Sequence, residues 1–153
     1  MTYVSVMTQV ISLLQAGVSG MTTVASKQTI MPKYTPDVCP LIALKYRPSG
    51  TTRISGTVTG PAIRKWYLDT ELTMYGTLAD DSDFEAAVES IEAVLCGNPF
   101  LGGLADTASG KVFLFGVGPP NAVKRGETYL SYQTPASVRR STTISALVQE
   151  EER

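Results

Sequence analysis

The chain of 153 residues contains no histidine. Histidine is the usual general base, the usual activator of serine and cysteine nucleophiles, and the commonest metal ligand in proteins. Its absence removes the most frequent routes to catalysis, and no other catalytic motif replaces it. We therefore expect a protein that is not an enzyme and that binds neither a metal ion nor another cofactor.

Cysteine is also scarce, because Cys39 and Cys96 are the only two. A single pair does not make a disulfide framework, and both are expected to be buried thiols. No lysine or arginine precedes Lys27, so the N-terminus lacks the basic region of a secretory signal and no export is expected. No run approaches the roughly 18 consecutive apolar residues that a membrane span requires. The sequence therefore predicts a soluble chain.

Two segments resemble ligand-binding loops only superficially. In GGLADTASGKV, six residues instead of four separate Gly103 from Gly110, and Val112 stands where a phosphate-binding loop needs serine or threonine. The acids of segment 81–92 have calcium-loop spacing, but Ala86 occupies the position that needs glycine. A turn before a strand and the acidic start of a helix explain these two patterns better.

Segment 65–97 has the clearest pattern in the chain. Its first half alternates apolar and polar residues, the period of a half-buried strand, and from Asp80 the apolar spacing changes to that of an amphipathic helix. Ser82 and Glu85 are spaced as a capping box, and Gly97 suits the position after the helix end. The predicted packed positions are Trp66, Leu68, Leu72, Met74 and Leu78 in the strand, and Phe84, Val88, Ile91 and Leu95 in the helix.

The rest of the chain supplies a helix, further strands and a long polar loop. We predict a helix at 4–14, a short strand around 28–31, strands at 41–47, 111–118 and 127–134, and a long hairpin connection or mobile arm at 48–61. This order predicts an α+β fold with a mostly antiparallel sheet, packed with two amphipathic helices. Residues 1–134 are interpreted as one domain, and 135–153 as a polar C-terminal arm that is either extended or a short helix docked elsewhere.

Charge is unevenly distributed, although the formal net charge is only −1. Segment 27–65 holds seven basic residues and one acid, whereas segment 66–97 holds eight acids and no base. Basic loops beside a solvated acidic helix would explain this asymmetry. Alternatively, patches of opposite sign meet between copies of the chain, as in a ring built from head-to-tail contacts.

Tyrosines lie on the polar side of the predicted long strand. Tyr67 and Tyr75, with Arg64 and Lys65 at the strand's start, have the residue types of a stacking platform for single-stranded nucleic acid. Asp69 lies on the same side and would repel phosphate. A protein interface suits these tyrosines at least as well.

The order of elements resembles that of the tail terminator (tail completion) proteins of long-tailed bacteriophages, over residues 4–134. Those proteins begin with a helix like that at 4–14 and continue through a proline-bearing extended segment into a strand like PLIALKY. A strand and an amphipathic helix like 65–95 follow, and strands such as VFLFGV and ETYLSYQ close the domain.

The resemblance implies a subunit of a homohexameric ring at the tail–neck junction of a virion, assembled in the host cytoplasm. Such a ring sits on the finished tail tube, stops its growth and offers a surface to the head-completion or connector protein. Genome DNA passes through without specific binding, and no membrane is involved.

The resemblance transfers no interface residue, so these are chosen from charge and residue type. Arg47, Arg53, Arg64 and Lys65 are expected to contact acids on a neighbouring subunit or on the tail tube protein, beside Tyr67 and Tyr75. Other neck or head-completion proteins and tail tube subunits remain alternatives. From other classes, a small hydrolase or nucleotide-binding enzyme and a small cellular adaptor or ligand-binding domain also remain open.

Overall fold

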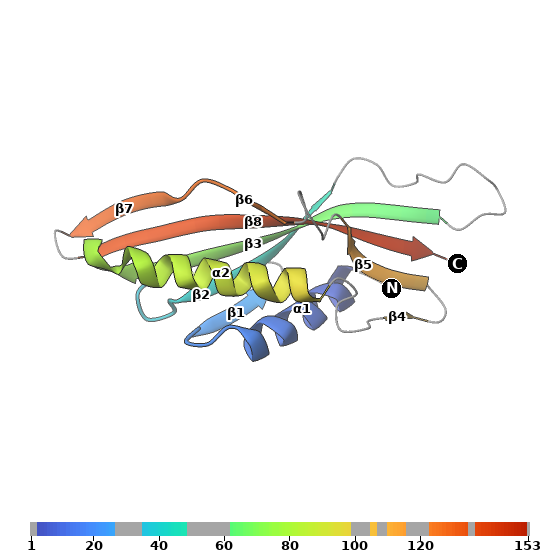
Figure 1. The fold of residues 1–153 in the computed structure, drawn as a ribbon, viewed down its shortest axis with the longest axis horizontal. Helices are drawn as coiled ribbons and strands as arrows, with labels where there is room; N and C mark the ends of the chain where they lie inside the picture. Colours follow the sequence, from blue (N-terminus) through green and yellow to red (C-terminus); the bar gives the residue numbers. More distant parts are fainter. Residues whose placement is uncertain are drawn as a thin grey trace.

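The computed structural model describes residues 3–26, 35–48, 62–98, 105–106, 110–115, 123–134 and 137–152. Within these ranges, helices α1 (Tyr3–Gly17) and α2 (Asp81–Gly97) pack against one face of an elongated sheet (Figure 1). A short 3-10 helix, η1 (Leu78–Asp80), leads into α2. The fold is α+β with a mostly antiparallel sheet, as the sequence predicts.

The sheet is built around two long central strands. In spatial order β1, β2, β3 and β8 are neighbours, and β7, β6 and β5 follow one another along the far edge of β8. Only the β1–β2 pair is parallel among the described pairs. The strands are β1 (Thr23–Ser26), β2 (Leu41–Pro48), β3 (Ala62–Gly76), β4 (Ala105–Asp106), β5 (Gly110–Phe115), β6 (Val123–Arg125), β7 (Tyr129–Thr134) and β8 (Ser137–Glu152).

The C-terminal segment is a central strand and not a separate arm. β8 pairs with β3 from Val138 opposite Gly76 to Glu152 opposite Ala62, and its other edge carries three further strands. The prediction of a domain at 1–134 followed by an arm at 135–153 is therefore wrong. The apolar alternation of a strand is hidden in this segment because polar Arg140 and Thr142 occupy two of the alternate positions that β8 buries. Those positions are Val138, Arg140, Thr142, Ile144, Ala146 and Val148.

Strand predictions elsewhere agree with the structure where it describes them. β2, β3 and β7 coincide closely with the predicted segments 41–47, 65–78 and 127–134, and β5 covers the start of 111–118. Residues 28–31, 49–61 and 116–118 lie outside the described ranges. β1 lies at 23–26, upstream of the predicted short strand.

α1 is confirmed and continues one turn beyond the predicted range. Its buried side is formed by Val6, Met7, Val10 and Leu14, which recur at helical spacing. Gly17 lets α1 approach α2 closely, because a Cβ at this position would collide with Val94. The chain then turns at Gly20, whose positive φ of 79° is readily adopted by glycine.

The observed capping box lies at the start of η1, earlier in the chain than the box predicted for α2. Thr77 Oγ1 accepts a hydrogen bond from the Ala79 N–H at 3.3 Å, and Asp80 Oδ2 accepts one from the Thr77 N–H at 2.6 Å. This capping box belongs to η1, so the predicted Ser82–Glu85 box is wrong: the chain enters α2 from a 3-10 turn. The hydrogen bonds from Thr77 lower the pKa of Asp80 below its usual value.

At its other end α2 is capped by Asn98. The Asn98 side chain donates from Nδ2 to the Val94 carbonyl oxygen at 2.7 Å. Gly97, predicted to follow the helix, is its last residue instead. The asparagine amide satisfies one of the carbonyl groups that a helix end leaves without an intrahelical partner.

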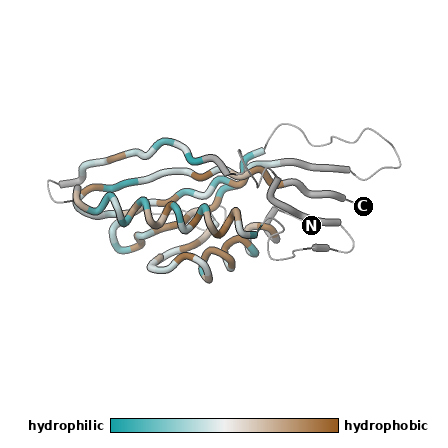
Figure 2. The backbone as a smooth tube through the Cα atoms, viewed as in Figure 1, coloured by the Kyte–Doolittle hydropathy of each residue, from teal (hydrophilic) through white to brown (hydrophobic). Residues whose placement is uncertain are grey.

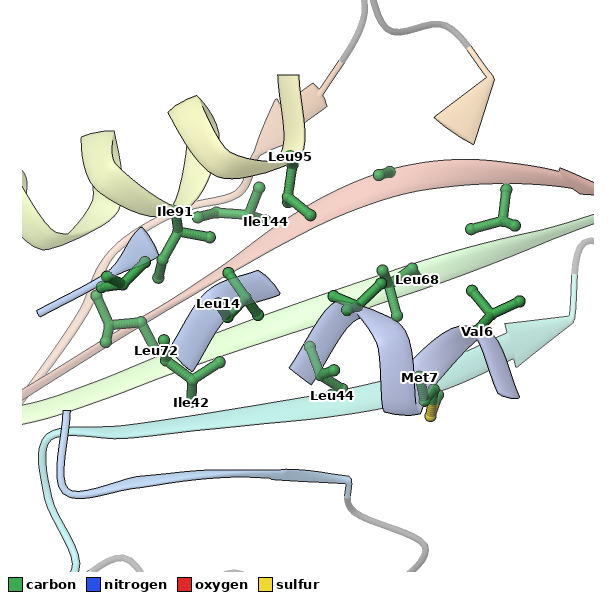
Figure 3. Packing of buried hydrophobic residues seen from close by; sticks show 14 of the residues in the cluster. Val6, Met7, Leu14, Ile42, Leu44, Leu68, Leu72, Ile91, Leu95 and Ile144 are labelled. Carbon is green, nitrogen blue, oxygen red and sulfur yellow. The ribbon is translucent and has the colours of Figure 1, made fainter. Parts of the chain in front are cut away.

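The core lies between the helix pair and the sheet (Figures 2 and 3). Trp66 is one of its largest buried side chains, and its ring centroid lies 5.2 Å from that of Tyr46. The predicted packed positions are buried in the structure except Met74, which is partly buried, and the side chain of Leu78 is not among those described. The helical stripe Phe84, Val88, Ile91 and Leu95 is confirmed.

The two cysteines are free thiols, but they are not buried as predicted. Cys96 is exposed at the end of α2, and Cys39 is half-buried before β2. Burial raises the pKa of the Cys39 thiol, so this side chain is a poor nucleophile near neutral pH.

Candidate functional site

Two surfaces of the sheet carry the candidate functional residues. We call the side opposite the helices the open face, and the outer side of β7 the β7 edge. The first holds Arg47, Tyr67 and Tyr75 of the interface residues predicted from sequence, and the second was not predicted.

On the open face, β2, β3 and β8 bring together a polar cluster. Arg47 Nε donates to Asp69 Oδ2 at 2.7 Å, and Arg47 Nη2 donates to Asp69 Oδ1 at 3.2 Å. Ser145 Oγ donates to Asp69 Oδ1 at 2.8 Å. The guanidinium carbon of Arg47 lies 4.2 Å from the centroid of the Tyr67 ring, a cation–π contact. The hydrogen bonds with Asp69 raise the pKa of Arg47 further above its usual value.

Strand register explains this cluster. Arg47 lies opposite Tyr67, and Asp69 lies opposite both Lys45 and Ser145, so the four side chains of the cluster share one side of the sheet. Arg47 and Tyr67 are thus brought together as the prediction of a shared interface requires. However, the acid that binds Arg47 is Asp69 of the same chain.

The other predicted interface residues are dispersed along the sheet. Arg53 lies outside the described residues. The backbones of Arg64 and Lys65 lie opposite Glu150 and Gln149 of β8. Tyr75 lies near the far end of β3, opposite Arg139. The six residues therefore do not form one compact site.

Two further ion pairs connect the acidic helix to the sheet. Arg125 of β6 makes two hydrogen bonds with the carboxylate of Glu85. Arg140 of β8, only 4% exposed, donates to the Thr77 carbonyl oxygen at 2.9 Å and lies 3.5 Å from Asp81. With Arg47–Asp69, these contacts show that part of the charge asymmetry is compensated within one chain.

A small hollow lies on the open face, between β3 and β8. It has a volume of about 130 Å³ and is lined by Glu71, Thr73, Arg139 and Ser141. Pockets for drug-sized ligands typically measure roughly 300–1,000 Å³ and are mostly apolar. This hollow suits a few water molecules or one polar side chain better than an organic ligand.

The β7 edge carries the most exposed large hydrophobic side chains of the described residues. Tyr129 is 65% exposed, Leu130 49% and Tyr132 66%. The register places Tyr129 opposite Ser141 on the open face, whereas Leu130 and Tyr132 lie opposite Arg140 and Val138 on the helix side. Both sides of this strand are therefore apolar and accessible.

The backbone of β7 is paired on one side only, as far as the structure describes the chain. Its described partner is β8, and it forms the outer boundary of the sheet at the end where α2 begins (Figure 1). An unpaired strand edge with large apolar side chains is the kind of surface that takes up another strand. The sequence signal was present in YLSY, which has apolar residues on both sides of a short strand.

The described residues contain no group of three or more cysteines or acids arranged to hold a metal ion. Neither α1 nor α2 combines the length and apolar character that crossing a membrane would require. A scan of protein-family models found no match, and a search of curated proteins found no similar sequence.

Proposed function

We propose that this protein is a structural virion protein: a ring-forming tail terminator that caps the tail tube of a long-tailed phage and joins it to the head connector. The observation that carries the proposal is the β7 edge, an accessible strand with three exposed large hydrophobic side chains at the boundary of the sheet.

Such an edge favours assembly because its backbone N–H and C=O groups and its apolar side chains are stabilised together when another strand is added. Tyrosines are enriched at protein interfaces since they bury a large apolar area and keep a polar hydroxyl at the rim. A contact between two different surfaces of identical subunits closes into a ring when the rotation allows it.

The order of elements supports the choice of a terminator among ring proteins. Helix α1, strands β2 and β3, helix α2 and strand β7 follow one another in the order that the resemblance to tail terminators rests on. In this proposal one side of the homohexamer contacts the tail tube protein and the other contacts the head-completion protein. DNA passes through the ring without specific binding.

Electron microscopy of the purified protein across a range of concentrations tests the proposal. A terminator forms closed rings of about six subunits that do not elongate. Open tubes would identify a tail tube subunit instead, and a protein that stays monomeric at every concentration would contradict a self-assembling ring. Other neck proteins that form rings are distinguished by adding tail tubes that lack a terminator, because only a terminator ring binds their ends.

A further inference from the structure

We propose that β7 of one copy pairs with β1 of the next copy, so that the sheets of neighbouring subunits form one continuous sheet around the ring. This inference rests on the proposed self-assembly and specifies its contact. It names a second copy of this chain as the occupant of the β7 edge.

The two strands are at opposite boundaries of one sheet. Among the described pairings, β1 pairs with β2 alone and β7 with β8 alone. Contacts between two different edges are heterologous, and repetition of such a contact can close a ring. A β7–β7 contact would instead be two-fold symmetric and would stop at a dimer.

Chain direction makes the proposed pair antiparallel. β1 is parallel to β2, each of the next two neighbours reverses direction, and β7 is antiparallel to β8. β7 therefore runs opposite to β1 within one subunit. Copies related by a rotation about an axis close to the strand direction present β7 and β1 to one another in antiparallel orientation, which is the commoner arrangement of neighbouring strands.

The two sides of the strands match as well. Val24 lies opposite Ile42 and contacts the core, so it is on the helix side, as Leu130 and Tyr132 are. Thr23 and Ala25 lie on the open face, as Tyr129 and Ser131 do, and all three residues 23–25 are only half-buried. Large side chains on β7 thus meet small or β-branched ones on β1, and aromatic with β-branched pairs stabilise antiparallel strands.

Neighbouring subunits are displaced along the strand direction in this arrangement. One row of the sheet runs through Thr23, Leu41, Thr73, Ser141 and Tyr129. The rest of β7 extends beyond this row at one end of the sheet, whereas the rest of β1 extends in the opposite direction. Pairing their full lengths requires a stagger between copies, and a closed sheet of tilted strands has such a stagger.

Site-specific disulfide cross-linking tests the contact. Cys39 and Cys96 are first replaced by serine, and Ser131→Cys and Thr23→Cys are made in separate chains. An Ala25→Cys chain samples the adjacent possible register on the same side of β1. Mild oxidation of a mixture of β7 and β1 variants is expected to give a cross-linked dimer that neither variant gives alone. A chain carrying both substitutions should give a ladder that ends at the size of the ring.

The outcomes separate this inference from the proposed function. Dimers formed by the Ser131→Cys chain alone would show a two-fold β7–β7 contact and overturn the inference. Rings that form without cross-links at either β1 position would overturn the inference but leave the terminator proposal standing. The absence of any assembly would overturn both. Glu89→Cys on the exposed side of α2 is the matched control and should not cross-link to Ser131→Cys.

Discussion

Arg140 of β8 lies buried beneath the start of α2 and donates a hydrogen bond to the carbonyl oxygen of Thr77 at 2.9 Å. A cation at a helix N-terminus is disfavoured by the helix dipole, and burial of the Arg140 charge is costly as well. The hydrogen bond to Thr77 and the nearby Asp81 carboxylate compensate these two costs. Arg140 therefore fixes where α2 begins relative to the central strand.

Replacing Arg140 tests this role. Arg140→Met keeps the aliphatic volume but removes the donor, and we expect the free energy of unfolding to fall by about 1.5–3 kcal/mol, the value of hydrogen bonds to charged groups. Asp81→Asn should cost less than about 1 kcal/mol, because the Asp81 side chain is 71% exposed. Urea denaturation measures both variants. Equal losses would contradict a role based on the Thr77 contact.

Glu85 and Arg125 predict a pH dependence. The hydrogen bonds from Arg125 lower the pKa of Glu85 in the folded protein. The ion pair therefore stabilises the fold fully above the usual glutamate pKa, and this stabilisation is lost as the pH falls through the lowered pKa of the folded state. Both side chains are partly exposed, and the pair is therefore worth only about 0.2–1 kcal/mol.

Glu85→Gln should thus destabilise the protein at pH 7 by this small amount and lose its effect in acid below the folded-state pKa. The exposed Glu89→Gln variant on the same helix is the control. Denaturation curves at several pH values make the comparison. A Glu85→Gln effect that persisted unchanged in acid would show that its cause is not the ion pair.

Deleting β8 distinguishes a central strand from a dispensable arm. A chain ending at Thr134 loses the strand that joins β3 to β5, β6 and β7, together with the buried Ile144, Ala146 and Val148. We expect this chain to lack cooperative unfolding in calorimetry. If it melted cooperatively near the temperature of the full chain, β8 would not be the centre of the sheet.

Trp66 provides a test of core packing. Its indole N–H is buried and has no hydrogen-bond partner within the described structure. Trp66→Ala should cost about 3–5 kcal/mol through the cavity it leaves, whereas Trp66→Phe should cost clearly less since most of the ring volume is kept and no hydrogen bond is lost. Chemical denaturation compares the two. Similar losses would indicate that the N–H has an acceptor.

Local periodicity made much of this fold predictable. β3 buries Trp66, Leu68 and Leu72 on one side, α2 buries a single helical stripe, and the apolar spacing predicts both elements. β8 was missed because Arg140 and Thr142 interrupt its apolar alternation. These polar residues are acceptable inside because both are hydrogen-bonded there.

The candidate site depends on which residues of neighbouring strands lie opposite one another, and local sequence patterns do not determine this register. Arg47 was recognised as basic and Tyr67 as lying on a polar side, but the pairing of β2 with β3 places Asp69 within reach of Arg47. The exposure of Tyr129, Leu130 and Tyr132 likewise follows from the position of β7 at the sheet boundary. Both facts arise from pairing between segments distant in sequence.

The most direct measurement is native mass spectrometry of the wild-type chain beside Leu130→Lys, with Ala93→Lys on the exposed side of α2 as the matched control. Lysine on an edge strand opposes the addition of a further strand. We predict a closed ring of about six subunits for the wild type and the control, and monomers for Leu130→Lys. Rings of unchanged size and stability in Leu130→Lys, or a monomeric wild type at every concentration, would contradict assembly through β7.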